Sequence, residues 1–289
     1  MNTPWNKEQL SIKGSNEWNE DALVINDSLA LYGVVDGSTS LVPYRGPGGE
    51  TGGKLASMLI SQHLEALGET VGTSFRLDEA VLEANRRLRE AMVHSGIDVS
   101  DKRQLWTAAL AAVRIHERSI EYVQAGDCML IAVYKDGTIR VVTHDQVAHI
   151  DKETKKLWQE GQQQGITTRE ELRQFVIPTI QRNRLKLNTL EGYSVVSGEP
   201  ELEDLLEYGR INRIQLKALL LITDGLFLPK EKGETASEFR ELTERIMRKG
   251  LAAYADWLIS LEEADADGRK YPRFKKSDDK TGIWITLED

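Results

Sequence analysis

The sequence predicts an α+β fold with mostly antiparallel sheets, and the grouping of its elements carries this prediction. Short runs rich in Val, Ile and Leu cluster with one another along the chain, and so do the helical patterns, instead of alternating strictly. Several runs are separated by short turn signals, such as residues 116–118 and 135–137, which suit antiparallel neighbours. No internal repeat and no low-complexity linker interrupts the 289 residues, so we expect one domain over residues 1–289.

The first part of the chain predicts a hairpin followed by two helices. Residues 22–27 and 28–37 are apolar runs that meet at a polar turn. After a loop rich in Gly and Pro, residues 54–67 repeat apolar side chains at the spacing of an amphipathic helix. Residues 77–93 show the same spacing, with Asp78 as the expected N-terminal cap.

The remaining segments predict a β region, a polar insertion and a final helical pair with one more strand. Residues 147–192 are polar and are expected to form a helical pair or a flap-like insertion. The expected strands are 106–115, 119–134 and 138–146, as an antiparallel meander, and then 193–198, 217–227 and 281–288; the expected helices are 236–247 and 251–264.

Composition limits the classes of function. The formal net charge of −9 argues against nucleic acid or an anionic membrane as a partner, because either would require a basic surface. The most basic short run, residues 182–186, is interpreted as a solvated helix end or loop. A single cysteine, Cys128, excludes an intramolecular disulfide, and no apolar run is long enough to span a bilayer. A cytoplasmic protein is the expectation.

Acidic residues stand where apolar strands begin or end. Asp36 and Asp224 each close a strongly apolar run, and each is followed by Gly. Further acids flank other predicted strands, namely Glu20, Asp21, Asp127, Asp278 and Asp279. Strand ends on one side of a sheet can converge, so these carboxylates are candidates for one shared site.

A cluster of carboxylates needs a compensating positive charge, because like charges in a poorly hydrated site raise one another's pKa. Few Lys or Arg residues lie in these segments. Oxygen ligands without His or Cys favour Mg²⁺ or Mn²⁺ over Zn²⁺. Gly37 has no side chain, so its carbonyl lies open to a close ligand. The competing interpretation is that Asp-Gly is only a common turn dipeptide, and we assign Asp136 to that class.

Six short motifs, in this order, resemble the metal-dependent protein phosphatase family of type 2C. The motifs are NEDA (19–22), VVDGST (34–39), GGKLAS (52–57), AGDC (125–128), LLLITDGL (219–226) and DDKTGIWI (278–285). The resemblance implies an α/β/β/α four-layer sandwich with two central, mostly antiparallel sheets. It also implies a protein serine/threonine phosphatase with two Mg²⁺ or Mn²⁺ ions and a phosphoprotein substrate.

The resemblance also assigns expected roles to individual residues. Asp36 is expected to bridge the two ions, with the Gly37 carbonyl on one of them. The other expected ligands are Asp224 and Asp278 on the first ion, Glu20 and Asp21 through water, and Asp127 at a third, weaker site. A water between the ions would attack phosphorus in line with the departing Ser or Thr oxygen. Asp279 occupies a position where many members carry Asn, and it is expected to support the ligands from behind.

Two departures from the family pattern concern the grip on the substrate. Asn16 stands where many members carry an Arg that holds the phosphate, and an amide forms no bidentate charged pair. Arg45 is a candidate replacement. Ser38 stands where some members carry a His that protonates the leaving group, and neither His63 nor His144 is an obvious substitute.

Two other classes of function compete with the phosphatase hypothesis. One is a catalytically weak or inactive phosphatase fold that binds a phosphoprotein or a regulator, which the presence of Asn16 favours. The other is a hydrolase that uses Asp36 as a nucleophile, but such chemistry usually needs a second acid two residues later, where Ser38 stands. The sequence does not indicate an oligomeric state.

Overall fold

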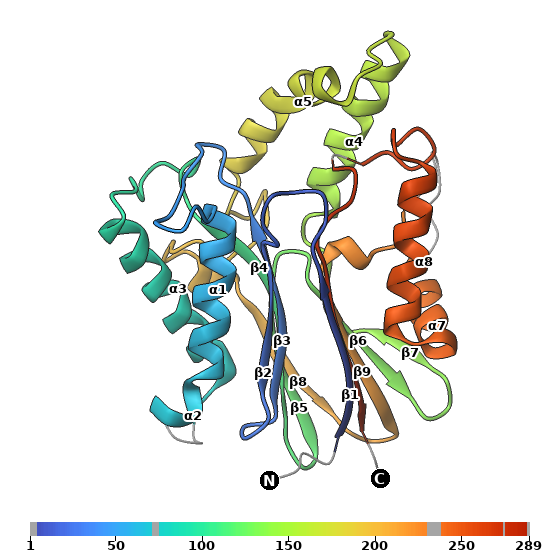
Figure 1. Ribbon diagram of the computed structural model, residues 1–289. Helices are drawn as coiled ribbons and strands as arrows, with labels where there is room; N and C mark the ends of the chain where they lie inside the picture. The colour runs from blue at the N-terminus through green and yellow to red at the C-terminus, as the bar shows by residue number, and fades with distance from the viewer. Residues whose placement is uncertain (1–4, 71–74, 230–237, 274, 288–289) are drawn as a thin grey trace.

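The computed structural model describes residues 5–70, 75–229, 238–273 and 275–287. Two five-stranded sheets pack face to face, and helices cover the outer face of each sheet (Figure 1). All strand pairs between neighbours are antiparallel. The predicted four-layer α/β/β/α sandwich is therefore confirmed.

One sheet contains the first and the last strand of the chain side by side. Its order is β1 (Trp5–Ile12), β10 (Lys280–Leu287), β9 (Leu216–Ile222), β6 (Met129–Tyr134) and β7 (Ile139–Val141). β1 was not predicted from the sequence, because it is an edge strand whose side chains are exposed or only half-buried. Such a strand lacks the clean apolar alternation that marks a half-buried strand.

The second sheet is built around the predicted hairpin. Its order is β2 (Asp21–Asn26), β3 (Leu31–Ser38), β4 (Thr107–Ile115), β5 (Ser119–Ala125) and β8 (Glu207–Asn212). β8 also escaped prediction, because Ile211 is the one buried residue of this edge strand. The segment 193–198, predicted as a strand, forms only two isolated bridges, Val196 with Ala108 and Tyr193 with Leu187.

The predicted single strand over 119–134 is wrong, and so is the meander that contained it. β5 ends at Ala125 in one sheet, and β6 begins at Met129 in the other. Gly126 makes the crossing with a φ of +81°, a conformation that favours glycine. Both strands are buried, so the sequence stays apolar from one strand to the next. Gly126 was the sole signal of the change of sheet, which is why the sequence predicted one strand.

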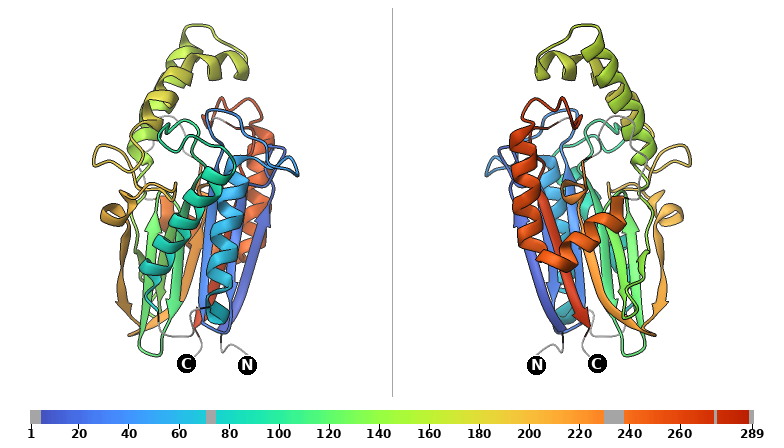
Figure 2. Two further views of the ribbon diagram at one scale, coloured as in Figure 1. Left: turned by 90° about the vertical axis from the view of Figure 1, so that its left-hand side faces the viewer. Right: turned by 90° about the vertical axis from the view of Figure 1, so that its right-hand side faces the viewer.

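Three apolar layers hold the sandwich together. α1 (Gly52–Glu65) and α3 (Leu77–His94) cover the β2–β3–β4–β5–β8 sheet, whereas α7 (Glu238–Lys249) and α8 (Leu251–Ala264) cover the other (Figure 2). Between the sheets lie side chains such as Val34, Leu130, Leu219 and Ile283. The shorter helices are α2 (Leu67–Thr70) and α6 (Leu202–Leu205).

Three predicted boundaries need comment. α3 begins one residue before Asp78, which is therefore in the first turn and pairs with Arg76 at 2.6 Å instead of capping the helix. Of the helix predicted over 236–247, residues 236 and 237 lie outside the described residues, and the others belong to α7. Residue 288 of the last predicted strand also lies outside them.

The polar segment in the middle of the chain forms a helical hairpin at one end of the sandwich. α4 (Ala148–Gln163) and α5 (Arg169–Arg184) pack on each other around Trp158, Leu172 and Val176. The hairpin stands beyond the sheets, at the end opposite to where β1 begins and β10 ends (Figures 1 and 2). We refer to α4 and α5 together as the flap.

A buried ion pair fixes the entry into β10. The ammonium group of Lys280 is 1 % exposed and donates to Glu262 of α8 at 2.8 and 3.1 Å. It also donates to the Ser277 hydroxyl at 2.9 Å and to the Asp278 carbonyl at 3.0 Å. One charged side chain thus ties the turn that carries Asp278 and Asp279 to α8.

We expect Lys280→Met to destabilise the protein by about 3–5 kcal/mol, because it leaves the Glu262 carboxylate buried without its partner. Urea unfolding followed by circular dichroism measures the change. The double variant Lys280→Met/Glu262→Leu should recover much of the loss, and Lys276→Met, an exposed neighbour, should have little effect. Equal stabilities for Lys280→Met and Lys276→Met would contradict this account.

Candidate metal centre

The ends of four core strands meet at the end of the sandwich that faces the flap (Figure 1). Asp21 at the start of β2 pairs directly with Asp36 near the end of β3. In the other sheet, Ile222 at the end of β9 pairs with both Gly282 and Met129. Asp224 follows β9, Asp278 precedes β10 and Asp127 precedes β6, so the three acids lie at the same edge of the sandwich.

Asp36 lies at the centre of the acidic cluster. Burial raises its pKa well above the usual value, and the charges of Asp21, Asp224, Asp127 and Asp278 raise it further. Asp36 and Asp224 lie close enough for each to influence the pKa of the other. The structure thus brings together these five of the seven acids selected from the sequence.

Asp21 links the two sheets. Its side chain is buried and accepts a hydrogen bond from the Thr223 hydroxyl at 2.9 Å. Burial raises its pKa to about 8, and the charges of Asp278 and Asp279 act in the same direction, against the hydrogen bond from Thr281. Asp21 thus belongs to the sheet of β2 and β3 but is held by residues at β9 and β10 of the other sheet.

Asp224 and Asp127 extend the cluster toward the flap. Burial raises the pKa of Asp224 to about 6, with a further contribution from Asp278. Burial also raises the pKa of Asp127 well above its usual value, and the charges of Asp224, Asp145 and Asp151 add to this. The two last acids were missed in the sequence, because they lie in the polar segment at the start of α4, where acids are common.

Asp279 supports the cluster from behind. Its two carboxylate oxygens accept hydrogen bonds from the backbone N–H groups of Gly14 and Glu20, each at 2.7 Å. These bonds attach the segment before β2 to the residue before β10. The contacts agree in kind with the supporting role expected from the sequence.

The side chain of Glu20 is bound by two threonine hydroxyls. It is 2 % exposed and accepts hydrogen bonds from the hydroxyls of Thr39 and Thr51. Thr51 caps α1, so Glu20 is tied to the start of that helix. It does not figure among the charges that raise the pKa of Asp36, and its contact with a metal through water remains a prediction.

Two glycines allow the close packing on which the site depends. A Cβ atom on Gly37 would lie 2.1 Å from the carbonyl oxygen of Gly53 at the start of α1. A Cβ atom on Gly225 would lie 1.7 Å from the carbonyl oxygen of Asp279. The glycine after each strand-ending aspartate therefore has a steric reason that the sequence did not reveal.

The residues expected to hold the phosphate are placed less favourably. Arg45 is exposed; it pairs with Glu17 at 2.9 Å and donates to the Gly49 carbonyl at 3.0 Å. Asn16 is half-buried in the segment before β2, and Ser38 is exposed at the end of β3. Arg45 is thus engaged by Glu17 and by the Gly49 carbonyl.

Lys275 is the residue near the acids that the sequence analysis missed. Its ammonium group donates to Asp278 Oδ1 at 2.6 Å. Although burial alone would lower the pKa of Lys275, the charges of Asp278, Asp36 and Asp224 outweigh burial and raise it. It follows Arg273 in a polar loop and resembled a solvated surface lysine in the sequence.

The chemistry of the donors fits hard divalent cations. The cluster offers only carboxylate and hydroxyl oxygens, and its summed charge is strongly negative. Within the described residues, no three His, Cys, Asp or Glu side chains already stand in an arrangement that would hold a metal ion. The ammonium group of Lys275 compensates part of this charge, and Mg²⁺ or Mn²⁺ held by the carboxylates would supply the rest.

A thiol mechanism is disfavoured by the surroundings of the single cysteine. Cys128 is fully buried, and burial together with the charge of Asp36 raises the pKa of its thiol well above the usual value. A thiol that resists ionisation is a poor nucleophile.

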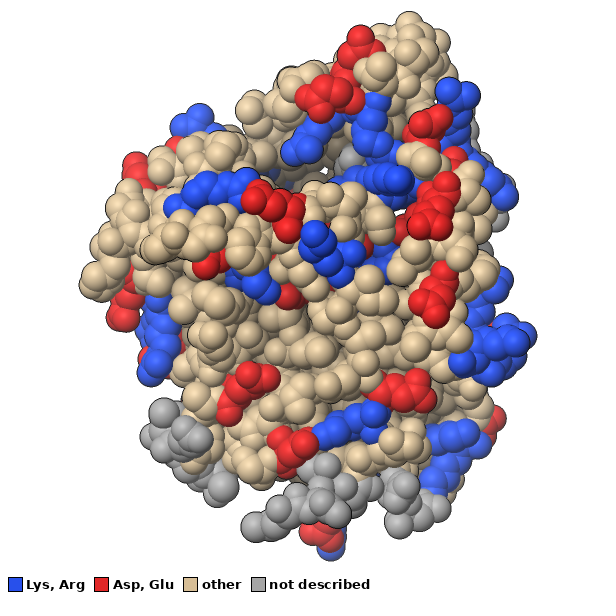
Figure 3. Space-filling model, in the orientation of Figure 1, with Lys and Arg blue, Asp and Glu red and all other residues tan. Residues whose placement is uncertain are grey.

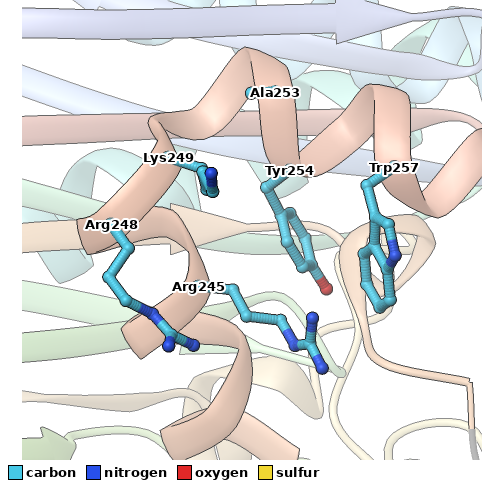
Figure 4. A pocket seen from close by; sticks show the side chains of 6 residues that line it. All are labelled: Arg245, Arg248, Lys249, Ala253, Tyr254 and Trp257. Atoms are coloured by element: carbon cyan, nitrogen blue, oxygen red, sulfur yellow. The ribbon is translucent and has the colours of Figure 1, made fainter.

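A cavity of about 330 Å³ between α7 and α8 is separate from the acidic cluster (Figure 4). It is lined by Arg245, Arg248, Lys249, Ala253, Tyr254 and Trp257. The Tyr254 hydroxyl donates to the Leu226 carbonyl at 2.8 Å, so this wall of the cavity also buttresses the 3₁₀ turn η1 (Asp224–Leu226). None of the lining residues is an acid, which excludes the cavity as the metal centre.

Comparison with known families and structures gives a consistent result. The family model described as Protein phosphatase 2C matches residues 11–259. No curated protein matches the chain.

Solved structures of three bacterial proteins, two of them described as serine/threonine phosphatases, share the fold. PstP/Ppp of Mycobacterium tuberculosis is 18 % identical, with a TM-score of 0.59 and 99 % of each chain covered; one of its structures is described as a complex with two manganese ions. Stp1 of Staphylococcus aureus is 17 % identical, with a TM-score of 0.56, 98 % of this chain covered and 95 % of that one. PppA of Pseudomonas aeruginosa is 17 % identical, with a TM-score of 0.54, 98 % of this chain covered and 97 % of that one.

A search of the described helices for membrane spans found none that is long and apolar enough to cross a bilayer.

The raised pKa values predict how stability depends on pH when divalent cations are chelated. Asp224 and Asp21 titrate near 6 and 8 in the folded chain and near 3.8 when unfolded. Stability contributed by their protonated forms is therefore complete below about pH 4 and is lost as the pH rises through 6 to 8. In EDTA we expect the Tm to fall by several degrees between pH 5 and 8, as measured by differential scanning calorimetry.

Two controls sharpen this prediction. Asp224→Asn should flatten the decline, because it removes one of the titrating groups. Excess Mn²⁺ at pH 8 should raise the Tm by mass action if the folded chain binds it. A Tm that rises with pH in EDTA would show that the cluster does not carry the protons assigned to it.

We expect Gly225→Ala to destabilise the protein by about 2 kcal/mol or more, because the new methyl group collides with the backbone of Asp279. The matched control is Gly68→Ala, where a Cβ would meet its nearest neighbour at an ordinary 3.5 Å. Thermal unfolding measures both variants. The steric account fails if both variants unfold at the temperature of the unmodified chain.

Proposed function

The chain belongs to the protein phosphatase 2C family of metal-dependent phosphoprotein phosphatases, and from this premise we propose that it removes phosphate from phosphoserine or phosphothreonine in proteins. The observation that supports the proposal most is that four other aspartates, from both sheets, lie close enough to the buried Asp36 to raise its pKa. A fold that buries so much like charge is destabilised by it unless cations enter. The donor chemistry selects Mg²⁺ or Mn²⁺.

We assign the ligands as the motif order suggests. Asp36 would lie between two cations, with Asp224 and Asp278 on one and the Gly37 carbonyl on the other. Asp21 and Glu20 would act through water, and Asp127 would belong to a third, weaker site. When bound, the cations would neutralise charge on the phosphoryl oxygens. They would also lower the pKa of a water molecule enough to supply hydroxide as the nucleophile near neutral pH.

The protein's own groups hold this arrangement in place. Asp279 binds the backbone of Gly14, and Lys280 binds the carbonyl of Asp278, so both residues that follow Asp278 help to hold it in place. Thr223 holds Asp21 from the opposite sheet. Because the carboxylates are positioned by buried bonds, little reorganisation is needed when the reaction develops charge.

The flap is proposed to select the phosphoprotein. We regard residues 1–289 as a single phosphatase domain, with residues 147–192 inserted at the end that carries the acids. Lys and Arg side chains gather around the hollow between the flap and the rest of the molecule (Figure 3). These cations suit the approach of a phosphorylated, anionic segment despite the net charge of −9.

The competing proposal is a phosphatase fold that binds phosphoproteins without turning them over. It is favoured by Asn16 and by the engagement of Arg45 with Glu17, which leave neither of the expected groups to hold the phosphate. Binding of a phosphopeptide without release of phosphate, in the presence of Mn²⁺, would favour this reading over the enzyme.

We expect Asp36→Asn to lower Mn²⁺-dependent hydrolysis of p-nitrophenyl phosphate by about 100-fold or more, because it removes the proposed bridging carboxylate. The matched control is Asp136→Asn, an exposed turn aspartate, which should hydrolyse the substrate like the unmodified chain. Calorimetric titration with Mn²⁺ separates a binding defect from a chemical one. Activity that persists in EDTA would overturn the metal-dependent assignment.

A further inference from the structure

We propose that Lys275 binds the phosphoryl oxygens of the substrate once divalent cations occupy the acidic cluster. The proposal deepens the function proposed above and rests on it. It assigns the grip on the phosphate to a residue that neither the motifs nor the family comparison indicates.

The position of Lys275 is the first argument. Its ammonium group contacts Asp278 at 2.6 Å and interacts electrostatically with Asp36 and Asp224. Those three acids are the ligands proposed to surround the reacting phosphorus. A cation coupled to all three lies within reach of any anion bound beside them.

The charge of the loaded site is the second argument. Asp21, Asp36, Asp224 and Asp278 carry four negative charges when all are ionised, and two divalent cations offset them. Asp127, at the proposed third site, adds a fifth negative charge that Lys275 would offset, so the loaded site would be close to neutral and would not repel a phosphate dianion. The same cations would compete with Lys275 for Asp278 and free the ammonium group for a new partner.

The surrounding contacts show how Lys275 is presented. Arg273 donates to Asp265 at 2.9 Å and to the carbonyl groups of Glu262 and Lys276 at 2.8 and 3.0 Å, which fixes the loop on both sides of Lys275. Arg169 of the flap donates to the Arg273 carbonyl at 2.8 Å. The backbone is thus held, whereas the Lys275 side chain is 38 % exposed and can be reached by a substrate.

The alternatives in the same region are weaker. Arg45 is exposed and paired with Glu17, and the amide of Asn16 carries no charge. An ammonium group on a flexible stem acts as a point charge with three donors, so it can exchange one oxygen partner for another without the fixed geometry that a guanidinium demands.

The test compares Lys275→Ala and Lys275→Arg with Lys276→Ala, an exposed lysine in the same loop. For each full-length variant, calorimetry measures binding of Mn²⁺ and then of inorganic phosphate to the Mn²⁺-loaded protein. Hydrolysis of p-nitrophenyl phosphate gives kcat and KM separately.

We expect Lys275→Ala to bind Mn²⁺ at least as tightly as the unmodified chain, because Asp278 loses a competing cation. Its affinity for inorganic phosphate should fall about tenfold or more, the size expected for one lost hydrogen bond to a charged group. KM should rise more than kcat falls. Lys275→Arg should recover most of the phosphate binding, and Lys276→Ala should bind like the unmodified chain.

Unchanged phosphate affinity in Lys275→Ala would overturn the proposal and leave Lys275 as a counterion of Asp278 only. Loss of Mn²⁺ binding in that variant would also overturn it, since Lys275 would then be required to shape the metal centre. If the unmodified chain itself bound no Mn²⁺, the proposed function would fail, and the assignment of Lys275 with it.

Discussion

The repulsion among carboxylates from two different sheets is the constraint around which this end of the molecule is organised. Asp21 and Asp36 come from one sheet, whereas Asp224 and Asp278 come from the other. Asp21, Asp224 and Asp278 raise the pKa of Asp36, and Asp278 also raises the pKa of Asp21 and of Asp224. Packing the sheets against each other forces the four together. The apolar layer between the sheets therefore does more than stabilise the fold. It also keeps the carboxylates close together despite their mutual repulsion.

Three side chains around the cluster hold the segments that carry the acids. Asp279 binds the backbone before β2, Lys280 binds α8 and the Asp278 carbonyl, and Tyr254 binds the turn that follows Asp224. All three connect elements that are distant in sequence. The site is thus an outcome of the whole sandwich rather than of any single loop, which explains why substitutions outside the cluster are expected to disturb it.

Two features distinguish the mouth of the site. Asp145, just before the flap, and Asp151, within it, lie near Asp127, and the loop before β10 brings Lys275 to Asp278. Arg169 joins these two parts by binding the loop from the flap. A substrate that entered between them would meet both the cations at the rim and the acidic floor.

The sequence by itself indicated mostly antiparallel sheets, most of the strands and the acids of the cluster, because strongly apolar runs and the acids at their ends are local patterns. The four layers were expected only from the resemblance to a known family. It could not place β1 and β8, whose edge positions leave little apolar alternation, or the change of sheet at Gly126, which leaves the apolar run intact. Only the tertiary structure turned Glu20 toward Thr39 and Thr51, engaged Arg45 with Glu17 and brought Lys275 to Asp278. Polar side chains pair with the groups that lie nearest to them in space, and these groups come together only when the two sheets pack.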